Sequence, residues 1–448
     1  MTSRFHRLGT LSCALAILVA ASAAAQSAAP EAPPHQHHEG MDMSQAGDNA
    51  SHDMAMHDMK GQLGPYPMSR EASGTSWQPE ATPMEMRETM RSDWSLSLHG
   101  FANLVYDRQT GPRGGRKGFS ESMLMGMATR PLGPGTFGVR GMVSLDPLMG
   151  SSGYPLLLQT GESPDGKTPL IDRQHPHDAF MELSASYSLP LGREGAAFVY
   201  AGLPGEPALG PATFMHRYSG MRNPEAPIAH HWFDATHVTF GVVTVGAIEG
   251  PWKVEGSWFN GREPDERRWN IETRRFDSWS TRLTWNPTHA WSAQASYGYV
   301  KSPEALEPEA SVRRLTASAT WQTRLAGREW ATTLAWARND KRWPEGRLLS
   351  PALLLESTYM VADRHTLFGR FEQVDKDELF STRDPLHGQS FRVRKLSLVY
   401  VHDFASTGPL RWGLGGVVGL PRVPAALEAA YGRDPMSYLL FLQARIAP

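Results

Sequence analysis

The stretch from Arg314 to Leu325, RLTASATWQTRL, decides the fold because its apolar and polar residues alternate almost without a break. Leucine, alanine, tryptophan and threonine form one row, and arginine, threonine, serine and glutamine form the other. A β-strand presents successive side chains on opposite faces, whereas a helix would scatter both rows around its circumference. The stretch therefore predicts a strand with one apolar and one polar side.

The same alternation recurs along the rest of the chain towards its C-terminus. In 276–285, for example, Trp279 and Leu283 oppose Ser280 and Arg282. We count about 16 such stretches, a strand number found among outer-membrane barrels. The pattern predicts an all-β fold, namely a transmembrane up-and-down antiparallel β-barrel of about 16 strands.

The connections between these stretches alternate in length. Short turns are predicted at 131–135, 190–195, 248–251, 286–290, 326–328, 362–364 and 402–408. Long loops are predicted at 107–118, 147–178, 204–235, 261–275, 302–312, 339–350, 375–389 and 421–435. An outer-membrane barrel has short periplasmic turns and longer external loops. The alternation of short and long connections therefore predicts a barrel with both termini in the periplasm.

The first 25 residues are typical of a secretory signal peptide. Arg4 and Arg7 precede an apolar core at 11–21, and three alanines at 23–25 form a small-residue cleavage site. The only cysteine of the chain, Cys13, lies within this segment. We therefore expect an exported mature chain without disulfides or thiolate metal sites.

The leader at 26–91 is rich in proline, alanine, serine, histidine and methionine and has no sustained period, so we predict a disordered periplasmic arm ahead of a barrel at 92–448. Five histidines and five methionines form a tract within it: His35, His37, His38, Met41, Met43, His52, Met54, Met56, His57 and Met59. Imidazole suits Cu(II) and thioether sulfur selects Cu(I), so the tract predicts copper binding, with silver as the second choice. Zinc or nickel binding and a mere low-complexity linker stay open as alternatives.

Further methionines follow the tract. Met84, Met86 and Met90 either extend it or plug the pore. Met123, Met125 and Met127 share one face of a predicted strand, and we interpret this row as facing lipid or as packing, since any strand face requires an apolar row at this spacing. A role in conduction would require the row to face the lumen.

Two of the long loops carry a second group of candidate ligands: His175, His177, Asp178, His216, His230, His231, Asp234 and His237. Both loops are expected on the same side of the barrel, so these side chains could converge at the pore mouth. A second metal site, a polar plug and ordinary loop packing are the three interpretations, because histidine also bonds backbone carbonyls in turns.

The exported leader carrying His35 to Met59 ahead of a barrel resembles the outer-membrane copper-resistance B proteins, in which a periplasmic Met/His-rich segment precedes a β-barrel. The resemblance rests on the tract and on the architecture, and no barrel motif carries it. It implies copper as the cargo and periplasmic copper-handling proteins, such as copper oxidases, as partners.

We therefore predict an outer-membrane protein, not an enzyme, that handles copper or silver ions at the cell envelope through its arm. Outer-membrane lipid is the expected surrounding, and a homotrimer follows by analogy with porins of this strand number. The net charge of −2 argues against nucleic acid as a partner, and no organic cofactor is expected. Two other functions stay open: a general or solute-selective porin with the arm as a linker, and an outer-membrane hydrolase that uses loop residues such as His177 or His230 as general bases.

Overall fold

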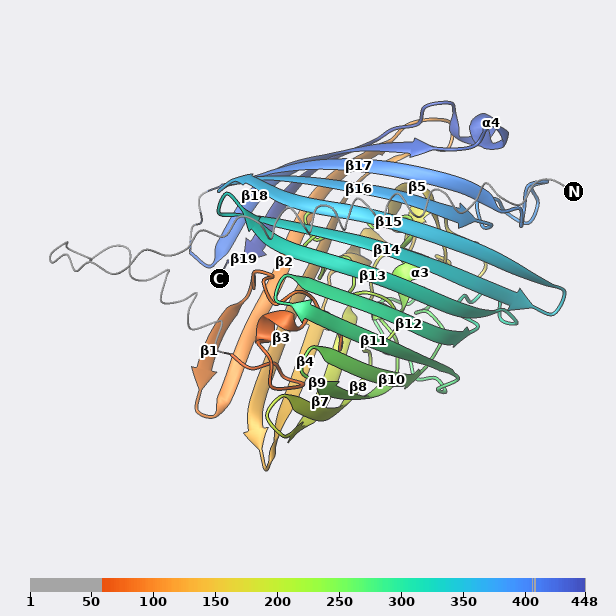
Figure 1. Ribbon diagram of the computed structural model, residues 1–448. Coiled ribbons are helices and arrows are strands. Elements are labelled where there is room, and N and C mark those ends of the chain that lie inside the picture. The colour runs from red at the N-terminus through yellow and green to blue at the C-terminus, as the bar shows by residue number, and fades with distance from the viewer. Residues whose placement is uncertain (1–58, 405, 407, 448) are drawn as a thin grey trace, which may run out of the picture. The chain divides into compact units, whose positions relative to one another are not determined.

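The computed structural model describes residues 59–404, 406 and 408–447, and within them sixteen strands form the wall of a closed barrel (Figure 1). In chain order the wall strands are β2 (Trp94–Gln109), β3 (Arg116–Leu132), β4 (Gly135–Val143), β7 (Phe180–Leu191), β8 (Gly195–Gly202), β9 (Val242–Glu249), β10 (Trp252–Phe259), β11 (Ser278–Thr288), β12 (Trp291–Lys301), β13 (Ser311–Leu325), β14 (Arg328–Trp343), β15 (Gly346–Ala362), β16 (His365–Lys376), β17 (Phe391–Asp403), β18 (Leu410–Arg422) and β19 (Ser437–Ile446). A further strand, β1 (Arg87–Arg91), pairs with the start of β2.

The ring closes because the last strand pairs with the first. β19 lies antiparallel to β2, with Phe441 opposite Val105. The other wall strands pair antiparallel with their neighbours in chain order. Closure leaves no unpaired strand edge, which a sheet in a membrane requires. The predicted fold class and strand number are confirmed.

The two sides of the wall differ as the alternation predicts. The outward side carries apolar residues such as Leu104, which is 62% exposed, and Val245, which is 60% exposed. On the inward side, Arg282, Arg370 and Lys253 are each at most 1% exposed. Side chains with such low exposure do not face open water, so protein fills the lumen around them.

Two long connections supply much of this filling. The connection at 144–179 contains η2 (Asp146–Met149), β5 (Tyr154–Thr160) and β6 (Ile171–Gln174), and the connection at 203–241 contains α3 (His230–Phe233) and η3 (Ala235–His237). Figure 1 places β5 and α3 within the ring of strands, and hydrogen bonds join them to the wall. Trp232 donates from Nε1 to the Ser350 carbonyl at 2.8 Å, and the Lys376 ammonium donates to the Gln159 side chain at 3.0 Å. None of the described helices is long and apolar enough to cross a membrane.

Buried ion pairs hold the connection at 203–241 against the wall. The carboxylate of Glu356 on β15 accepts a hydrogen bond from Arg217 of the connection at 2.7 Å and another from Arg370 of β16 at 3.1 Å. Glu225 of the connection lies 2.6 Å from the ammonium of Lys395 on β17. Because buried charges are costly without partners, each pair ties the fold of the connection to the closure of the wall.

Residues 60–91 are ordered, so the prediction of a disordered arm is wrong for this part. The segment includes η1 (Met68–Arg70) and packs against the inner wall. Arg140 donates to the Gly74 carbonyl at 2.9 Å, and Lys253 donates to the Thr75 carbonyl. The amino-acid composition of this segment could not predict that it is ordered, because the hydrogen-bond partners of its backbone lie on strands far along the chain. The rest of the predicted arm lies outside the described residues.

The prediction of a long loop at 339–350 is also wrong. β14 and β15 continue through it and turn at 344–345. Asp340 accepts hydrogen bonds from Arg342 at 2.9 Å and from Arg347 at 2.7 Å, so the charged run is paired within the hairpin. The last long connection contains η4 (Ala425–Leu427) and α4 (Glu428–Tyr431).

Replacing Arg217 by alanine should release the connection at 203–241 while leaving the ring closed. Glu356 would lose one of its two guanidinium partners, and breaking a buried pair in this way costs about 3–5 kcal/mol. Limited proteolysis of the protein in detergent should then cut within this connection. The control is R347A, which removes a half-exposed partner of Asp340 at a cost of about 0–1 kcal/mol. Equal protease resistance of the two variants would contradict this anchoring role.

Candidate metal centre in the lumen

Five histidines from the two connections converge inside the barrel. His175 and His177 precede β7, whereas His230 and His231 lie on α3 and His237 ends η3. Their rings form a continuous group in which neighbouring ring centres are 5.2–6.3 Å apart. We call these five residues the imidazole cluster.

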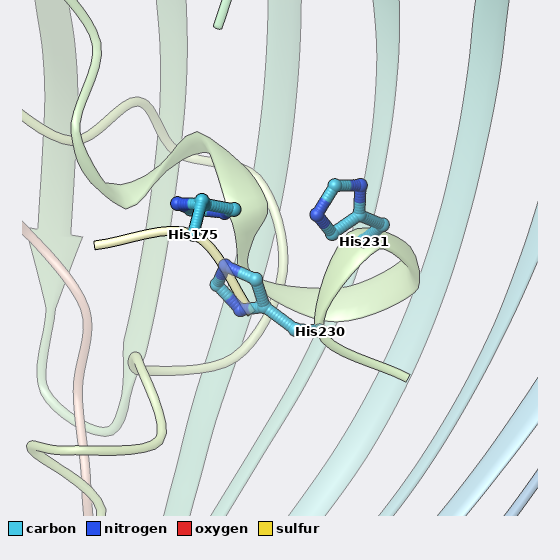
Figure 2. A group of neighbouring side chains, drawn as sticks. All are labelled: His175, His230 and His231. Carbon is cyan, nitrogen blue, oxygen red and sulfur yellow. The ribbon is translucent and has the colours of Figure 1, made fainter. Parts of the chain in front are cut away.

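Three members of the cluster form the tightest group. Figure 2 shows His230 and His231 at successive positions of α3, with His175 facing them from the neighbouring connection. One ring nitrogen from each lies within 4.8 Å of the other two. Bonds from imidazole to Zn(II) are about 2.0–2.1 Å long, so small side-chain rotations would bring all three nitrogens onto one ion.

The placement of His231 depends on a glycine. Gly161 has a φ of +111°, and a Cβ at this position would lie 1.9 Å from Cε1 of His231. Only glycine combines this backbone conformation with such a close approach to the ring. The connection at 144–179 can therefore pass directly over the cluster.

Hydrogen bonds orient three of the rings. His230 donates from Nδ1 to the Asp234 carboxylate and His237 donates from Nδ1 to the Asp234 carbonyl, both at 2.8 Å. His177 donates from Nδ1 to the Asp146 carboxylate at 2.9 Å. A ring held in this way presents the lone pair of Nε2, which is the usual arrangement of metal-ligating histidines. The Nε2 atoms of His177 and His237 are buried and have no hydrogen-bond partner among the described residues.

The two predicted aspartates position other groups. Asp234 also accepts a hydrogen bond from Arg217 at 2.9 Å. Burial would raise the pKa of Asp234, but the hydrogen bond from His230 and the charge of Arg217 hold it below its usual value. Asp178 lies 3.1 Å from the guanidinium of Arg268. These contacts suit a positioning role better than the general-base role that a hydrolase would require.

Acidic side chains surround the cluster. Glu162 lies 3.3 Å from Nε2 of His175, and Glu263 and Glu304 each lie 3.9 Å from Nδ1 of His231. Burial and repulsion from neighbouring carboxylates raise the pKa of Glu263 and of Glu304. Burial also lowers the pKa of His175 and of His231, which favours their neutral, ligating form. A bound cation would offset the repulsion among the carboxylates.

The remaining predicted site residues lie elsewhere. His216 is apart from the cluster, and its ring centre is 6.1 Å from that of His99 on β2. His99 was missed because a single histidine in a strand forms no pattern. Of the predicted tract, Met59 is described and packs beside buried residues of the lumen. The other members of the tract lie outside the described residues, so their metal binding stays a prediction: His35, His37, His38, Met41, Met43, His52, Met54, Met56 and His57.

Comparisons with known proteins identify the fold but do not show what the protein binds. No family model matches the sequence, and no curated protein matches it. OprB of Pseudomonas putida is similar with a TM-score of 0.52 and 11% identity, covering 80% of this chain and 94% of that chain. OmpF of Salmonella typhi, solved in complex with daunomycin, is similar with a TM-score of 0.50 and 9% identity, covering 80% of this chain and 100% of that chain.

These similar structures are barrels of the Gram-negative outer-membrane porin type, and at such low identity the likeness concerns the fold alone. The resemblance to copper-resistance B proteins gains no support from them and stays a prediction.

Metal binding by the imidazole cluster should persist in mild acid. Burial holds the pKa of His175, His231 and His237 below the ordinary value of about 6.5, so these rings stay neutral when exposed histidines gain a proton. In full-length protein with the tract histidines replaced by alanine, Zn(II) affinity should change little between about pH 7.5 and 5.5. Isothermal titration calorimetry measures this. A steep loss of affinity near pH 6.5 would show ordinary, exposed ligands instead.

Proposed function

We propose that this chain is an outer-membrane barrel that binds copper or silver ions at the cell envelope and holds them inside its lumen. The observation that carries the proposal is the imidazole cluster, where three ring nitrogens converge. Buried Nε2 atoms of His177 and His237 lie in the same cluster without a hydrogen-bond partner among the described residues. Buried polar atoms usually have a partner, and a cation bound at the cluster would provide one for both of them.

The closed ring with an apolar outward side supports placement in lipid, and the signal-type N-terminus supports export. The short turns and the end of β19 lie at the same end of the barrel. In outer-membrane barrels the short turns face the periplasm, so both termini are proposed to lie there.

The donor sets favour copper. Imidazole alone suits zinc, nickel and Cu(II), whereas the mixture of imidazole and thioether in the tract at 35–59 suits copper in both oxidation states. The tract would capture periplasmic ions, since several weak ligands on one tether raise each other's local concentration. Periplasmic copper-handling proteins are the proposed partners, and a homotrimer stays a prediction.

The test is Cu(II) binding by full-length protein in detergent, measured by equilibrium dialysis and elemental analysis. With the tract histidines and methionines replaced, the protein should still bind Cu(II). Adding H175A, H230A and H231A should weaken that binding by roughly 100-fold or more, because the ligands act together.

The matched control is the pair H365A and H402A, whose ring centres are 4.7 Å apart at the short-turn end of the barrel. Cells producing the triple variant should also be more copper-sensitive than cells producing the control. Equal Cu(II) binding by the two variants would refute a role for the cluster.

A solute-selective porin is the second candidate, because walls of 16 strands surround an aqueous channel in porins. The burial of the lumen side under the two connections and residues 60–86 argues against a wide channel in this chain. In planar bilayers the full-length protein should therefore give small conductance steps or none. Large steps that are independent of copper and unchanged in the triple variant would favour the porin function.

A further inference from the structure

A cavity of about 80 Å³ inside the barrel is lined by methionines from three distant parts of the chain. Two come from β3, one from the connection at 203–241 and three from the segment at 60–86. The six are Met68, Met84, Met86, Met125, Met127 and Met221. We call this cavity the thioether chamber.

The methionine row of β3 faces inward and packs in the core, so the packing interpretation is confirmed and the lipid-facing alternative is wrong. Met123, Met125 and Met127 are at most 9% exposed, whereas Leu124 between them is 47% exposed on the outward side. Barrel lumens are usually polar, and the inward row of β11 consists of serine, arginine, threonine and asparagine. Inward apolar residues also occur on other wall strands, for example Val399 on β17 and Phe441 on β19. What sets this place apart is its methionine content, because six of the 20 methionines of the chain line this one cavity.

Two histidines complete the donor set of the chamber. His99 donates from Nδ1 to the Glu85 carbonyl at 2.6 Å, so its Nε2 presents a lone pair. His216 has a buried Nε2 without a hydrogen-bond partner among the described residues. Both residues line the cavity. The chamber therefore combines thioether sulfur with neutral imidazole.

Most charged atoms of the chamber have partners. Glu85 pairs with Arg222 and lies 2.7 Å from Arg445, and Arg140 donates to the Gly74 carbonyl at 2.9 Å. One oxygen of Glu71 accepts a hydrogen bond from the Tyr66 hydroxyl at 2.9 Å, whereas its Oε2 is buried without a partner among the described residues. The ligands left for a cation are therefore one carboxylate oxygen and a larger number of neutral, soft donors. A soft monovalent cation fits them best, because thioethers select Cu(I) and similar ions over hard or divalent ones.

The chamber lies close both to Met59 and to the imidazole cluster. The backbone NH of Met68 donates to the carbonyl of Met59, the last residue of the tract, at 2.8 Å. His216 follows two residues after Phe214, whose ring centre lies 5.6 Å from that of His230 and 6.5 Å from that of His177.

We propose that the thioether chamber is a binding site for Cu(I) or Ag(I), formed only when residues 60–86 pack against β3. The site deepens the proposed function and rests on it for its role. The binding itself can be tested separately, since Ag(I) reports on sulfur and Zn(II) on the imidazole cluster.

The test uses Ag(I) alone as the probe. The parent protein is the full-length chain in detergent, with the tract histidines replaced by alanine and with Met41, Met43, Met54 and Met56 replaced by leucine. This protein should bind Ag(I), and X-ray absorption should show sulfur neighbours. Adding M84L, M86L, M125L and M127L should weaken Ag(I) binding by roughly 100-fold or more, because the remaining ligands lose their multivalency. Leucine conserves the volume of methionine, so the barrel should keep its fold and its shift in electrophoretic mobility on heating.

The matched control is M142L with M181L, which changes two buried methionines of the same core that do not line the chamber. The control should bind Ag(I) like its parent. Unchanged Ag(I) affinity in the fourfold variant, or absorption spectra with nitrogen and oxygen neighbours only, would overturn the inference.

Loss of Zn(II) binding with retained Ag(I) binding in the H175A, H230A and H231A variant would show that the two sites are separate. Retained Ag(I) binding without any Zn(II) or Cu(II) binding in the parent would support the chamber and refute the function proposed for the cluster.

Discussion

Closure of the antiparallel ring is the constraint on which the rest of the structure depends. Once β19 pairs with β2, every wall strand has two partners and the strand period of two assigns each residue to the outside or the lumen. A slip of one residue would exchange Leu283 with Arg282 across the wall and place a charge outside. The apolar exterior and the charged interior are thus two consequences of one register.

The charged interior in turn requires the connections to fold inward. Residues such as Lys253 and Glu356 are fully buried, and besides neighbours on the wall each has a partner in the segment at 60–86 or in the connection at 203–241. A wall of this size without such filling would surround water. The ion pairs and backbone contacts convert it into a nearly solid barrel in which particular side chains are brought together.

Two kinds of donor are brought together at different places. The connections at 144–179 and 203–241 join to make the imidazole cluster, whereas residues 60–86, β2, β3 and another part of the connection at 203–241 line the thioether chamber. Imidazole prefers borderline ions and thioether prefers soft ones, so under the proposed function the two sites would differ in the oxidation state of copper that they favour. Phe214 and His216 belong to one connection and contact both regions, which links the two sites mechanically.

Alternation along each strand is a local property, so the barrel class, the strand number and most connections followed from the pattern in stretches such as 314–325. The candidate histidines of the two loops were recognisable for the same reason, because they form short local strings. The order of residues 60–91, the inward row at Met125 and the role of His99 were not predictable. Each depends on contacts between residues far apart in the chain, such as Arg140 with Gly74, and composition holds no record of such partners. Local periodicity determined whether each strand residue faces outward or into the lumen. Only the tertiary structure determined which inward side chains contact each other, because those contacts depend on how the connections fill the space inside the closed ring.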